Sequence, residues 1–359
     1  MVRIENYDPL LKTGPVAPQK RASRFVKPLL GYLIALACLI WVFHDVHPGE
    51  FYRTFAGVHW IWALLAVVID VLSYVVQGVR WRLLLLGKGN ITVLRATQAI
   101  YAGLFTNEIL PLRIGELVRG YLVSRWLSRD FFSIFPSIAV ERLFDSVWLA
   151  VLIGLSAFVA PLPARLIESE NILGAMVLLG TGLFLYLVLR EEKKLEDDGE
   201  GSLYLLKYPS LWKPLRIAKN FIDRLAFEMK EIGLTRFFYA SFCISFFVIF
   251  FEIIAFWLVM DAFNLDLPFT VGAVVFLIVH IGTALPNAPG NVGTYQFFTV
   301  LGLALFGVDK TVAAGFSVAV FVILSIPLLG LGLIAFLNTG VPLARIKGEI
   351  NGMLSKMKI

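Results

Sequence analysis

Charged side chains gather in one stretch of this otherwise apolar sequence. Residues 107–119 read Asn-Glu-Ile-Leu-Pro-Leu-Arg-Ile-Gly-Glu-Leu-Val-Arg, so two glutamates and two arginines surround a proline and a glycine. Arg113, Glu116 and Arg119 are spaced by three, so on a helix Glu116 could pair with either arginine. An arginine with spare donors suits a phosphate, which its planar guanidinium binds through two hydrogen bonds. Two readings stay open, a structural ion pair that holds the turn and a phosphate-binding site.

A second turn repeats part of this pattern. The motif Leu-Pro-x-x-x-Gly occurs at residues 110–115 and again at 285–290. Because proline is tolerated at the first position of a helix, Pro111 and Pro289 predict that a helix begins just after each turn. The unpaired N–H groups of such a helix start favour an anion. The candidate binding and turn residues are Asn107, Glu108, Pro111, Arg113, Gly115, Glu116 and Arg119 at the first turn, and Pro286, Asn287, Pro289, Gly290, Asn291, Gly293 and Thr294 at the second.

Three further charges lie within one apolar stretch. Glu141, Arg142 and Asp145 are two acids and one base, so one carboxylate is in surplus. That carboxylate could pair with Arg113 or Arg119 on another helix, or it could take up a proton. All three are candidate substrate-binding residues, because ionisable side chains inside a membrane usually serve function.

Another acid, Glu252, has no partner nearby in the sequence. It could be protonated, pair with an arginine or couple protons to transport, and it is also a candidate site residue. Asp70, Tyr74 and Gln77 recur at i, i+4 and i+7, which places a polar stripe on one helix face. We expect that stripe to face the interior of a bundle.

The composition is that of an integral membrane protein. Hydrophobic residues make up 58% of the 359 residues and charged residues only 16%, with a mean hydropathy of +0.79. A soluble domain has about 45–50% apolar and about 25% charged residues. The alternating pattern of a membrane β-barrel is absent from the sequence, so the fold class is an all-α polytopic membrane protein.

Hydropathy and length divide the chain into about six full spans and two broken-helix hairpins. A span needs about 20 apolar residues, so arms of about 15 residues are typical of re-entrant segments. Full spans are predicted at residues 25–43, 60–81, 132–160, 172–189, 237–260 and 312–337. The short arms are predicted at residues 96–109, 112–126, 269–285 and 292–306, and if both hairpins cross fully there are ten spans.

Each half of the chain then holds two spans, a re-entrant hairpin and one more span. Three crossings per half are odd, so the halves have opposite orientation, as in the inverted repeats of transporters. The predicted organisation is a disordered basic tail (1–24), a first membrane repeat (25–190), a cytoplasmic loop with an amphipathic helix (191–236), a second membrane repeat (237–343) and a basic tail (344–359).

The distribution of basic residues predicts the orientation. The net charge is +6, and arginine and lysine cluster where the chain should return to the cytoplasm, as at Arg80, Arg82, Lys88 and Arg95. Both termini are therefore predicted to be cytoplasmic, in a multi-pass protein of the cell (inner) membrane. The charge indicates contact with anionic lipid, and we expect no nucleic-acid partner.

The four histidines lack metal-ligand spacing and no nucleotide-binding motif is present, so neither a metal nor a cofactor is expected.

Three motifs in this order resemble the flippase-like membrane domain family, which includes the membrane region of lysylphosphatidylglycerol synthases. They are residues 111–119, the sequence Glu-Arg-Leu-Phe-Asp at 141–145, and Pro-x-x-Pro-Gly-x-x-Gly at 286–293. The resemblance covers residues 25–340 and implies movement of polar lipids or lipid-linked sugars between leaflets. Where family members resemble P-G-G-x-G-x-x-E, this chain has Asn291 and Gln296, which bears on the charge of the substrate.

Two classes of function follow. The leading hypothesis is a flippase or scramblase for a polar phospholipid (anionic, zwitterionic or aminoacylated) or a lipid-linked sugar. The alternative is a membrane-embedded lipid-modifying enzyme, or an accessory subunit of a glycosyltransferase. The family's synthases carry a large soluble aminoacyl-transferase domain, for which we expect no room in this chain. A homo-oligomer and a partner synthase or glycosyltransferase both remain open.

The transport hypothesis predicts that Arg119→Ala abolishes lipid movement while the protein remains folded. The measurement is leaflet accessibility of labelled anionic, zwitterionic and lysyl-bearing lipids in proteoliposomes whose outer leaflet is quenched. Exchange by the variant at the wild-type rate would contradict it.

Overall fold

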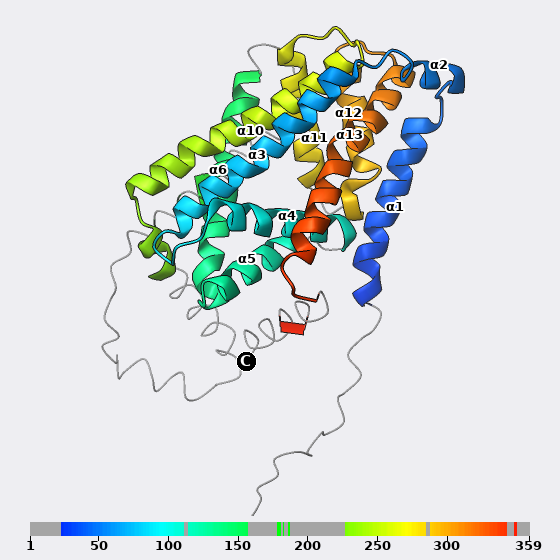
Figure 1. The fold of residues 1–359 in the computed structure, drawn as a ribbon. Helices are drawn as coiled ribbons and strands as arrows, with labels where there is room; N and C mark the ends of the chain where they lie inside the picture. The colour runs from blue at the N-terminus through cyan, green and yellow to red at the C-terminus, as the bar shows by residue number, and fades with distance from the viewer. Residues whose placement is uncertain are drawn as a thin grey trace, which may run out of the picture.

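The computed structural model describes residues 23–110, 114–156, 178–180, 182, 186, 227–284, 288–342 and 348–349, with side chains from residue 31 onward. Within these ranges every regular element is a helix, as the composition predicts. The helices form one elongated bundle (Figure 1).

Three helices are long and apolar enough to cross a membrane. They have 26, 27 and 28 residues, and an 18-residue stretch of each has a mean hydropathy of 1.9, 2.6 and 2.7, respectively. At 1.5 Å per residue each is about 39–42 Å long, against about 30 Å of hydrocarbon. These helices confirm three of the predicted spans, namely α3 (Trp60–Leu85), α10 (Arg236–Ala262) and α13 (Lys310–Leu337).

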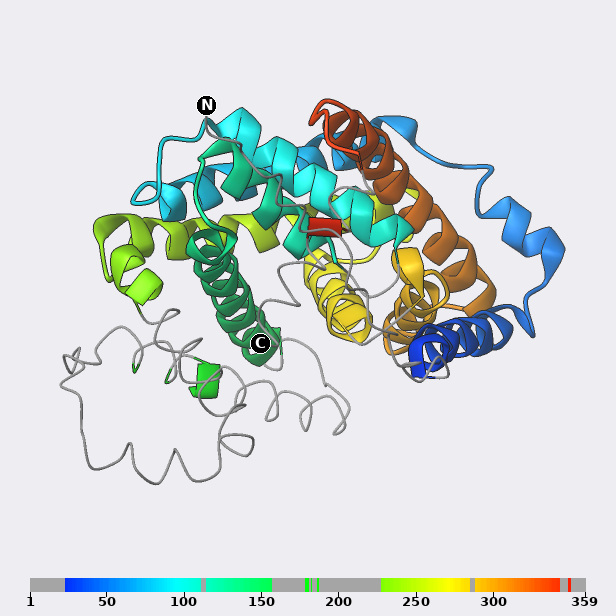
Figure 2. The ribbon, with the colours of Figure 1, turned by 90° about the horizontal axis from the view of Figure 1, so that it is seen from below.

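The other predicted spans are matched less completely. The helix α1 (Ser23–Phe43) lies at the edge of the bundle beside α12, with the short helix α2 (Pro48–Arg53) after it (Figure 2). The helix α6 (Phe131–Ser156) has 26 residues but carries three charges near its middle. Residues 157–160 and most of the span predicted at 172–189 lie outside the described residues.

The first predicted hairpin consists of two short helices packed on each other, α4 (Val93–Ile109) and α5 (Gly115–Trp126). A helix follows the first turn, as predicted: α5 begins at Gly115, three residues after the start predicted for this arm, and residues 111–113 lie outside the described residues. The Asn107 Oδ1 atom accepts a hydrogen bond from the Gly115 backbone N–H at 2.7 Å. This bond satisfies one of the unpaired donors at the start of α5.

The second hairpin consists of α11 (Phe269–Ala284), a 3₁₀ turn η1 (Pro289–Asn291) and α12 (Thr294–Ala304). Pro289 begins the 3₁₀ turn, and a helix follows this turn as predicted, two residues after the start predicted for the arm. The left-handed conformations of Gly290 and Gly293, at φ +70° and +89°, interrupt the chain before α12 begins at Thr294.

The two hairpins open toward opposite ends of the bundle, and their tips meet. The first is tied to the end of α3 by a hydrogen bond from Arg129 Nε to the Lys88 carbonyl oxygen, at 3.1 Å. The second follows α10, whose last residue accepts a hydrogen bond from the His59 N–H at the start of α3. Between them, α4 contacts η1. In Figure 1, α11 and α12 lie toward α2, and α4 and α5 lie at the other end.

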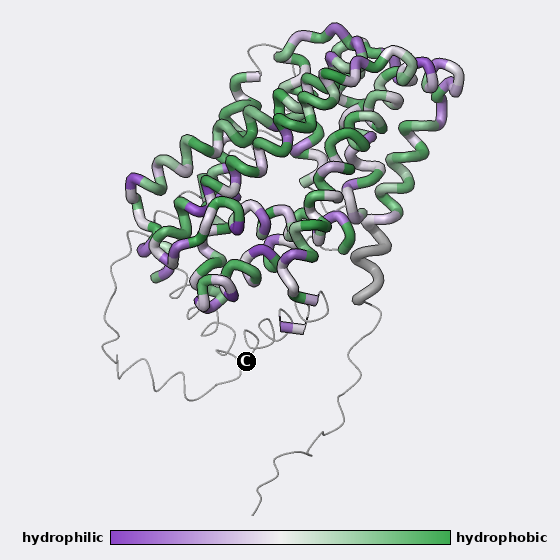
Figure 3. Tube along the Cα trace, viewed as in Figure 1, coloured by the Kyte–Doolittle hydropathy of each residue, from purple (hydrophilic) through white to green (hydrophobic). Residues whose placement is uncertain are grey.

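The apolar and polar residues are distributed in keeping with this arrangement of the helices. Apolar residues dominate the long helices, whereas polar residues gather at the two ends of the bundle and at scattered positions inside it (Figure 3). Of the loop with an amphipathic helix predicted at residues 191–236, the structure describes residues 227–236, of which 227–232 are helical and Arg236 begins α10. Met229 and Ile232 are buried there against Leu84, Val140 and Phe144, so this part packs on protein.

The close approach of α4 and α5 generates a stability prediction. A Cβ atom on Gly115 would lie 2.0 Å from the Gly103 carbonyl oxygen, whereas one on Gly330, at the exposed face of α13, would meet nothing within 4 Å. We expect Gly115→Ala to lower the free energy of unfolding by about 1–3 kcal/mol, as is typical of overpacking, and so to lower the thermal unfolding temperature in detergent. The matched control Gly330→Ala should leave it unchanged or raise it. Equal unfolding temperatures for the two variants would contradict this packing.

Candidate functional site

Two arginines and one glutamate form a buried set of ion pairs between α3, α5 and α6. Glu141 Oε1 lies 3.1 Å from Arg80 Nη2, and Glu141 Oε2 lies 2.9 Å from Arg119 Nη1. The side chains of Arg80 and Glu141 are 0% exposed and that of Arg119 is 4% exposed. One carboxylate therefore lies between two guanidinium groups, away from solvent.

A second set of ion pairs lies beside it and is more open. Arg142 Nη2 is 3.3 Å from Glu116 Oε1, and Arg142 Nη1 is 3.4 Å from Asp145 Oδ2. The Arg142 side chain is 53% exposed, that of Glu116 35% and that of Asp145 20%. Here one guanidinium lies between two carboxylates.

Two further ion pairs join these sets into a closed ring. Arg119 Nη2 lies 2.6 Å from Glu116 Oε2, and Arg80 Nη1 is in contact with Asp145 Oδ1. Each member thus pairs with two members of opposite charge, and the ring as a whole is neutral. We call it the ion-pair ring, and its members are Arg80, Glu141, Arg119, Glu116, Arg142 and Asp145.

Pairing of this kind is what allows charges to remain buried, since each partner replaces hydration that the ion has lost. Of the two alternatives left open for the surplus carboxylate, the structure shows the cross-helix pair, between Glu141 and Arg119. Arg80 Nη2 and Arg119 Nη2 lie within ion-pair distance of Glu141 and Glu116, although neither makes a hydrogen bond of good geometry to a described residue.

Arg80 is the member that the sequence analysis missed. It was assigned to the cytoplasmic end of a span that stopped at Trp81, and this assignment is wrong. The helix α3 continues to Leu85, and Arg80 Nη1 donates to Ser245 Oγ on α10 at 3.0 Å. A signal was present in the sequence, because Arg80 follows Gln77 by three residues and continues the polar stripe of α3.

Arg119 is also positioned by an aromatic ring. Its guanidinium carbon lies 4.8 Å from the centroid of Trp81, a distance typical of a cation–π contact. The Trp81 indole N–H donates to Ser137 Oγ on α6 at 2.9 Å. Residues of α3, α5 and α6 therefore hold the buried part of the ion-pair ring together.

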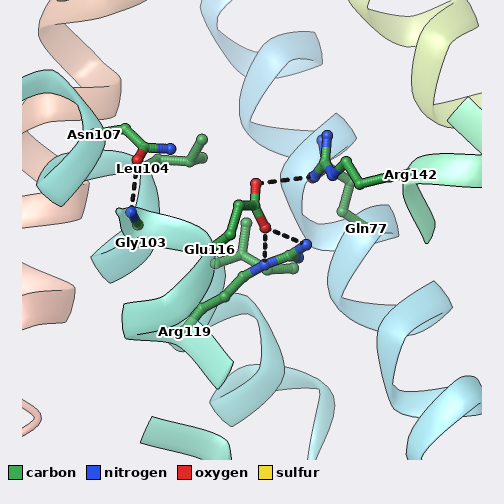
Figure 4. Close-up of a pocket in the computed structure, with 9 residues that line it drawn as sticks. Gln77, Gly103, Leu104, Asn107, Glu116, Arg119 and Arg142 are labelled. Atoms are coloured by element: carbon green, nitrogen blue, oxygen red, sulfur yellow. Dashed lines mark hydrogen bonds and ion pairs between the residues drawn. The ribbon is translucent and has the colours of Figure 1, made fainter. Parts of the chain in front are cut away.

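A small cavity opens beside Glu116 and Arg142 (Figure 4). It offers about 20 Å³ to the centre of a water-sized molecule, which is room for one water. Residues of the second turn are not among those that line it in the described part of the chain. The lining residues are Gln77, Ile100, Gly103, Leu104, Asn107, Gly115, Glu116, Arg119 and Arg142.

The tip of the first hairpin reaches the second at Glu108. A Cβ atom on Gly290 would lie 3.0 Å from Glu108 Oε2, so glycine allows this approach. Gly293 likewise packs against α1, since a Cβ there would lie 2.4 Å from the Ala35 carbonyl oxygen. The two turns therefore lie close together at Glu108 and Gly290.

Other candidates of the second turn organise the start of α12. Gln296 Oε1 accepts from the Gly293 N–H at 2.7 Å, and Thr294 Oγ1 donates to the Asn291 carbonyl at 3.0 Å. The amide of Gln296 can therefore cap the helix start without carrying charge. Four candidates lie outside the described residues, namely Pro111, Arg113, Pro286 and Asn287.

Glu252 is joined to α3 and not directly to an arginine. Its Oε1 atom accepts a hydrogen bond from Gln77 Nε2 at 3.2 Å. Across the described ranges, no group of three or more histidine, cysteine, aspartate or glutamate side chains is arranged to hold a metal ion.

The fold and the site define a class, the polytopic helical membrane proteins with charged groups buried inside the bundle. Residues 29–332 match the family described as the lysylphosphatidylglycerol synthase TM region. The chain belongs to this family, and the resemblance noted from the motifs is confirmed.

Curated relatives agree with a multi-pass membrane protein. The "Glycosyltransferase AglD" of Haloferax volcanii is 25% identical over 333 residues, which cover 84% of this chain and 52% of that protein. Two "UPF0104 membrane proteins" of Methanothermobacter thermautotrophicus are 22% and 26% identical, over 80% and 82% of this chain and 87% of each relative. The chain thus spans about half the length of the glycosyltransferase and most of the UPF0104 proteins.

The ring changes the outcome expected for Arg119→Ala. Because the substitution removes one partner of buried Glu141, it should destabilise the fold by the about 3–5 kcal/mol typical of a broken buried pair. The matched control Arg125→Ala removes an exposed arginine of α5, whose Nη1 lies 3.6 Å from Glu349, and should cost about 0–1 kcal/mol. Thermal unfolding in detergent compares them, and similar losses for both variants would contradict a stabilising ring.

Proposed function

We propose that this protein moves a polar lipid between the two leaflets of a membrane. The observation that carries the proposal is the open side of the ion-pair ring, where Arg142 lies between two carboxylates next to a cavity. Membership of a family described by the membrane region of a phospholipid-modifying synthase supports lipid as the class of substrate.

The chemistry of the ring suits a phosphate headgroup through an exchange of partners. The ring is neutral, so an anion gains little unless it replaces a carboxylate. A lipid phosphate at Arg142 could take the two parallel hydrogen bonds that arginine offers and release Glu116 or Asp145. Since Glu116 also pairs with Arg119, its carboxylate keeps one partner during the exchange. The buried part of the ring need not open.

Passage of a lipid also requires movement. The cavity has room for about one water, so a headgroup can enter only if the helices that bear the open side separate. The helix α5 has 12 residues and is separate from α4, which ends at Ile109. We infer that this short helix moves relative to α6, because α5 carries Glu116 and α6 carries Arg142.

The proposed topology is an inverted repeat, residues 25–190 and 237–343, with two re-entrant hairpins that enter from opposite faces. The opposed hairpins α4–α5 and α11–α12 support it. Basic residues at the α4–α5 end, including Arg82, Arg95 and Arg129, support placing that end in the cytoplasm. Both termini would then be cytoplasmic, in the inner membrane.

A second candidate function is supported by one relative. The protein named as a glycosyltransferase matches 84% of this chain with about half of its own length. This membrane region could therefore serve glycosyl transfer as an accessory unit that presents a lipid-linked sugar.

The transport proposal predicts that Arg142→Gln slows lipid exchange at least about tenfold, which corresponds to about 1.4 kcal/mol of lost interaction. The variant should remain folded because Arg142 is half-exposed. Arg125→Gln is the matched control, an arginine of similar exposure (45%) whose ion pair lies outside the ring. Exchange of labelled anionic and zwitterionic lipids in proteoliposomes is the measurement.

Equal exchange rates for the two variants would contradict the role of Arg142. If wild-type protein converts the labelled lipid into a new species on a chromatogram, the lipid-modifying enzyme replaces the transporter. If it neither moves nor converts lipid until a glycosyltransferase is added, the accessory role is favoured.

A further inference from the structure

We propose that Asp70 and Glu252 form a proton-binding site in the middle of the bundle, and that this site couples proton movement to lipid transport. The coupling rests on the function proposed above, whereas the proton site itself does not. The site lies between α3 and α10, which pack against each other along the bundle.

Asp70 is a buried acid without a neutralising partner. The residue is 7% exposed. Across the described ranges its carboxylate makes neither a hydrogen bond nor an ion pair, and Ser73 Oγ donates to its backbone carbonyl instead, at 2.7 Å. An unpaired carboxylate in an apolar interior is costly, and binding a proton removes its charge.

Glu252 is the second acid of the site. It accepts from Gln77 Nε2, but a neutral amide cannot balance its charge. Asp70 and Glu252 interact electrostatically with each other, and Tyr74 interacts with both. Tyr74 therefore lies within electrostatic range of two carboxylates from neighbouring helices.

The ion-pair ring does not balance the charge of Asp70 and Glu252. Arg80 and Arg142 are the cations that act on Glu252. Each of them already pairs with two carboxylates of the ring. The ring holds three arginines and three acids, so it has no net positive charge to offer Asp70 and Glu252.

An independent observation points to a ligand at this place. The Tyr101 hydroxyl on α4 is buried and has no hydrogen-bond partner among the described residues, and the residue is 6% exposed. Its ring lies against that of Tyr74, with centroids 5.2 Å apart, and it interacts electrostatically with Asp70. A water or a protonated carboxyl between these groups would satisfy the hydroxyl.

Titratable groups lie on the elements that pack around the site, and on α11 this group is His280. Those on α3 are Tyr74 and Arg80, and α13 has a single titratable residue, Lys310, at its first position. The remaining titratable groups are Tyr101 and Glu108 on α4, Arg142 and Asp145 on α6, and Tyr295 on α12.

The proposed step is balanced in charge and atoms. A proton from water on one side of the membrane binds a carboxylate of the site and forms a carboxylic acid. After the helices rearrange, the acid dissociates and the proton returns to water on the other side. No bond other than O–H forms or breaks.

The proton site is tested by infrared spectroscopy of the full chain in lipid at neutral pH. We expect a carboxylic-acid C=O band that shifts in D₂O and that loses about half of its intensity in Asp70→Asn and in Glu252→Gln. Asp45→Asn, an exposed acid that pairs with Lys310, is the control and should leave the band unchanged. Gel filtration and thermal unfolding establish that each variant is folded. A band that neither variant changes would overturn the proposal.

The coupling is tested by lipid distribution under a pH gradient. With one proton per lipid, a difference of one pH unit can sustain up to about a tenfold ratio of labelled lipid between leaflets. We expect this bias in wild type and a ratio near one in Asp70→Asn. If exchange occurs without bias, the coupling is wrong and the transport function stands. If the infrared band behaves as expected but no labelled lipid moves, the proton site stands and the transport function fails.

Discussion

The structure depends on the cost of placing charge inside an apolar bundle. Six ionisable side chains meet between α3, α5 and α6, and each pairs with two of opposite sign. Removal of any member of the ion-pair ring would take one partner from each of two buried or half-buried charges. This explains why a short, charged helix such as α5 remains within the bundle. It also divides the ring into a closed side around Glu141 and an open side around Arg142.

The opposed hairpins place this ring where movement would have consequences. Gly115 allows α5 to approach α4 at backbone distance, and Gly290 does the same for the second turn against Glu108. Where glycine forms the contact, few side-chain rotamers need to change when one helix slides along another. A lipid-moving protein needs a stable charge network that can exchange one partner, and the ring combines a fixed side with an exchangeable one.

The sequence predicted the helical membrane class and the charged residues of the site, because apolar composition and intramembrane charge are local signals. It predicted that a helix follows each turn, and α5 and α12 begin three and two residues after the predicted starts of these arms. The hydrogen bond from the Gly115 N–H to Asn107 crosses the hairpin and could not be predicted. Arg80 was missed because an arginine at the end of an apolar run usually reaches toward the interface. The closed ring could not be predicted, as spacing along one helix does not tell which helix faces it. The hydrogen bond between Gln77 and Glu252, which are 175 positions apart, could not be predicted for the same reason.

The central claim is that lipid phosphate competes with Glu116 for Arg142. A double-mutant cycle of Glu116→Gln and Arg142→Gln tests it most directly, with unfolding free energy measured in neutral detergent and again with added anionic phospholipid. The account predicts a favourable coupling in neutral detergent that falls toward zero when the phospholipid is present. A coupling that is unchanged by anionic lipid would contradict it.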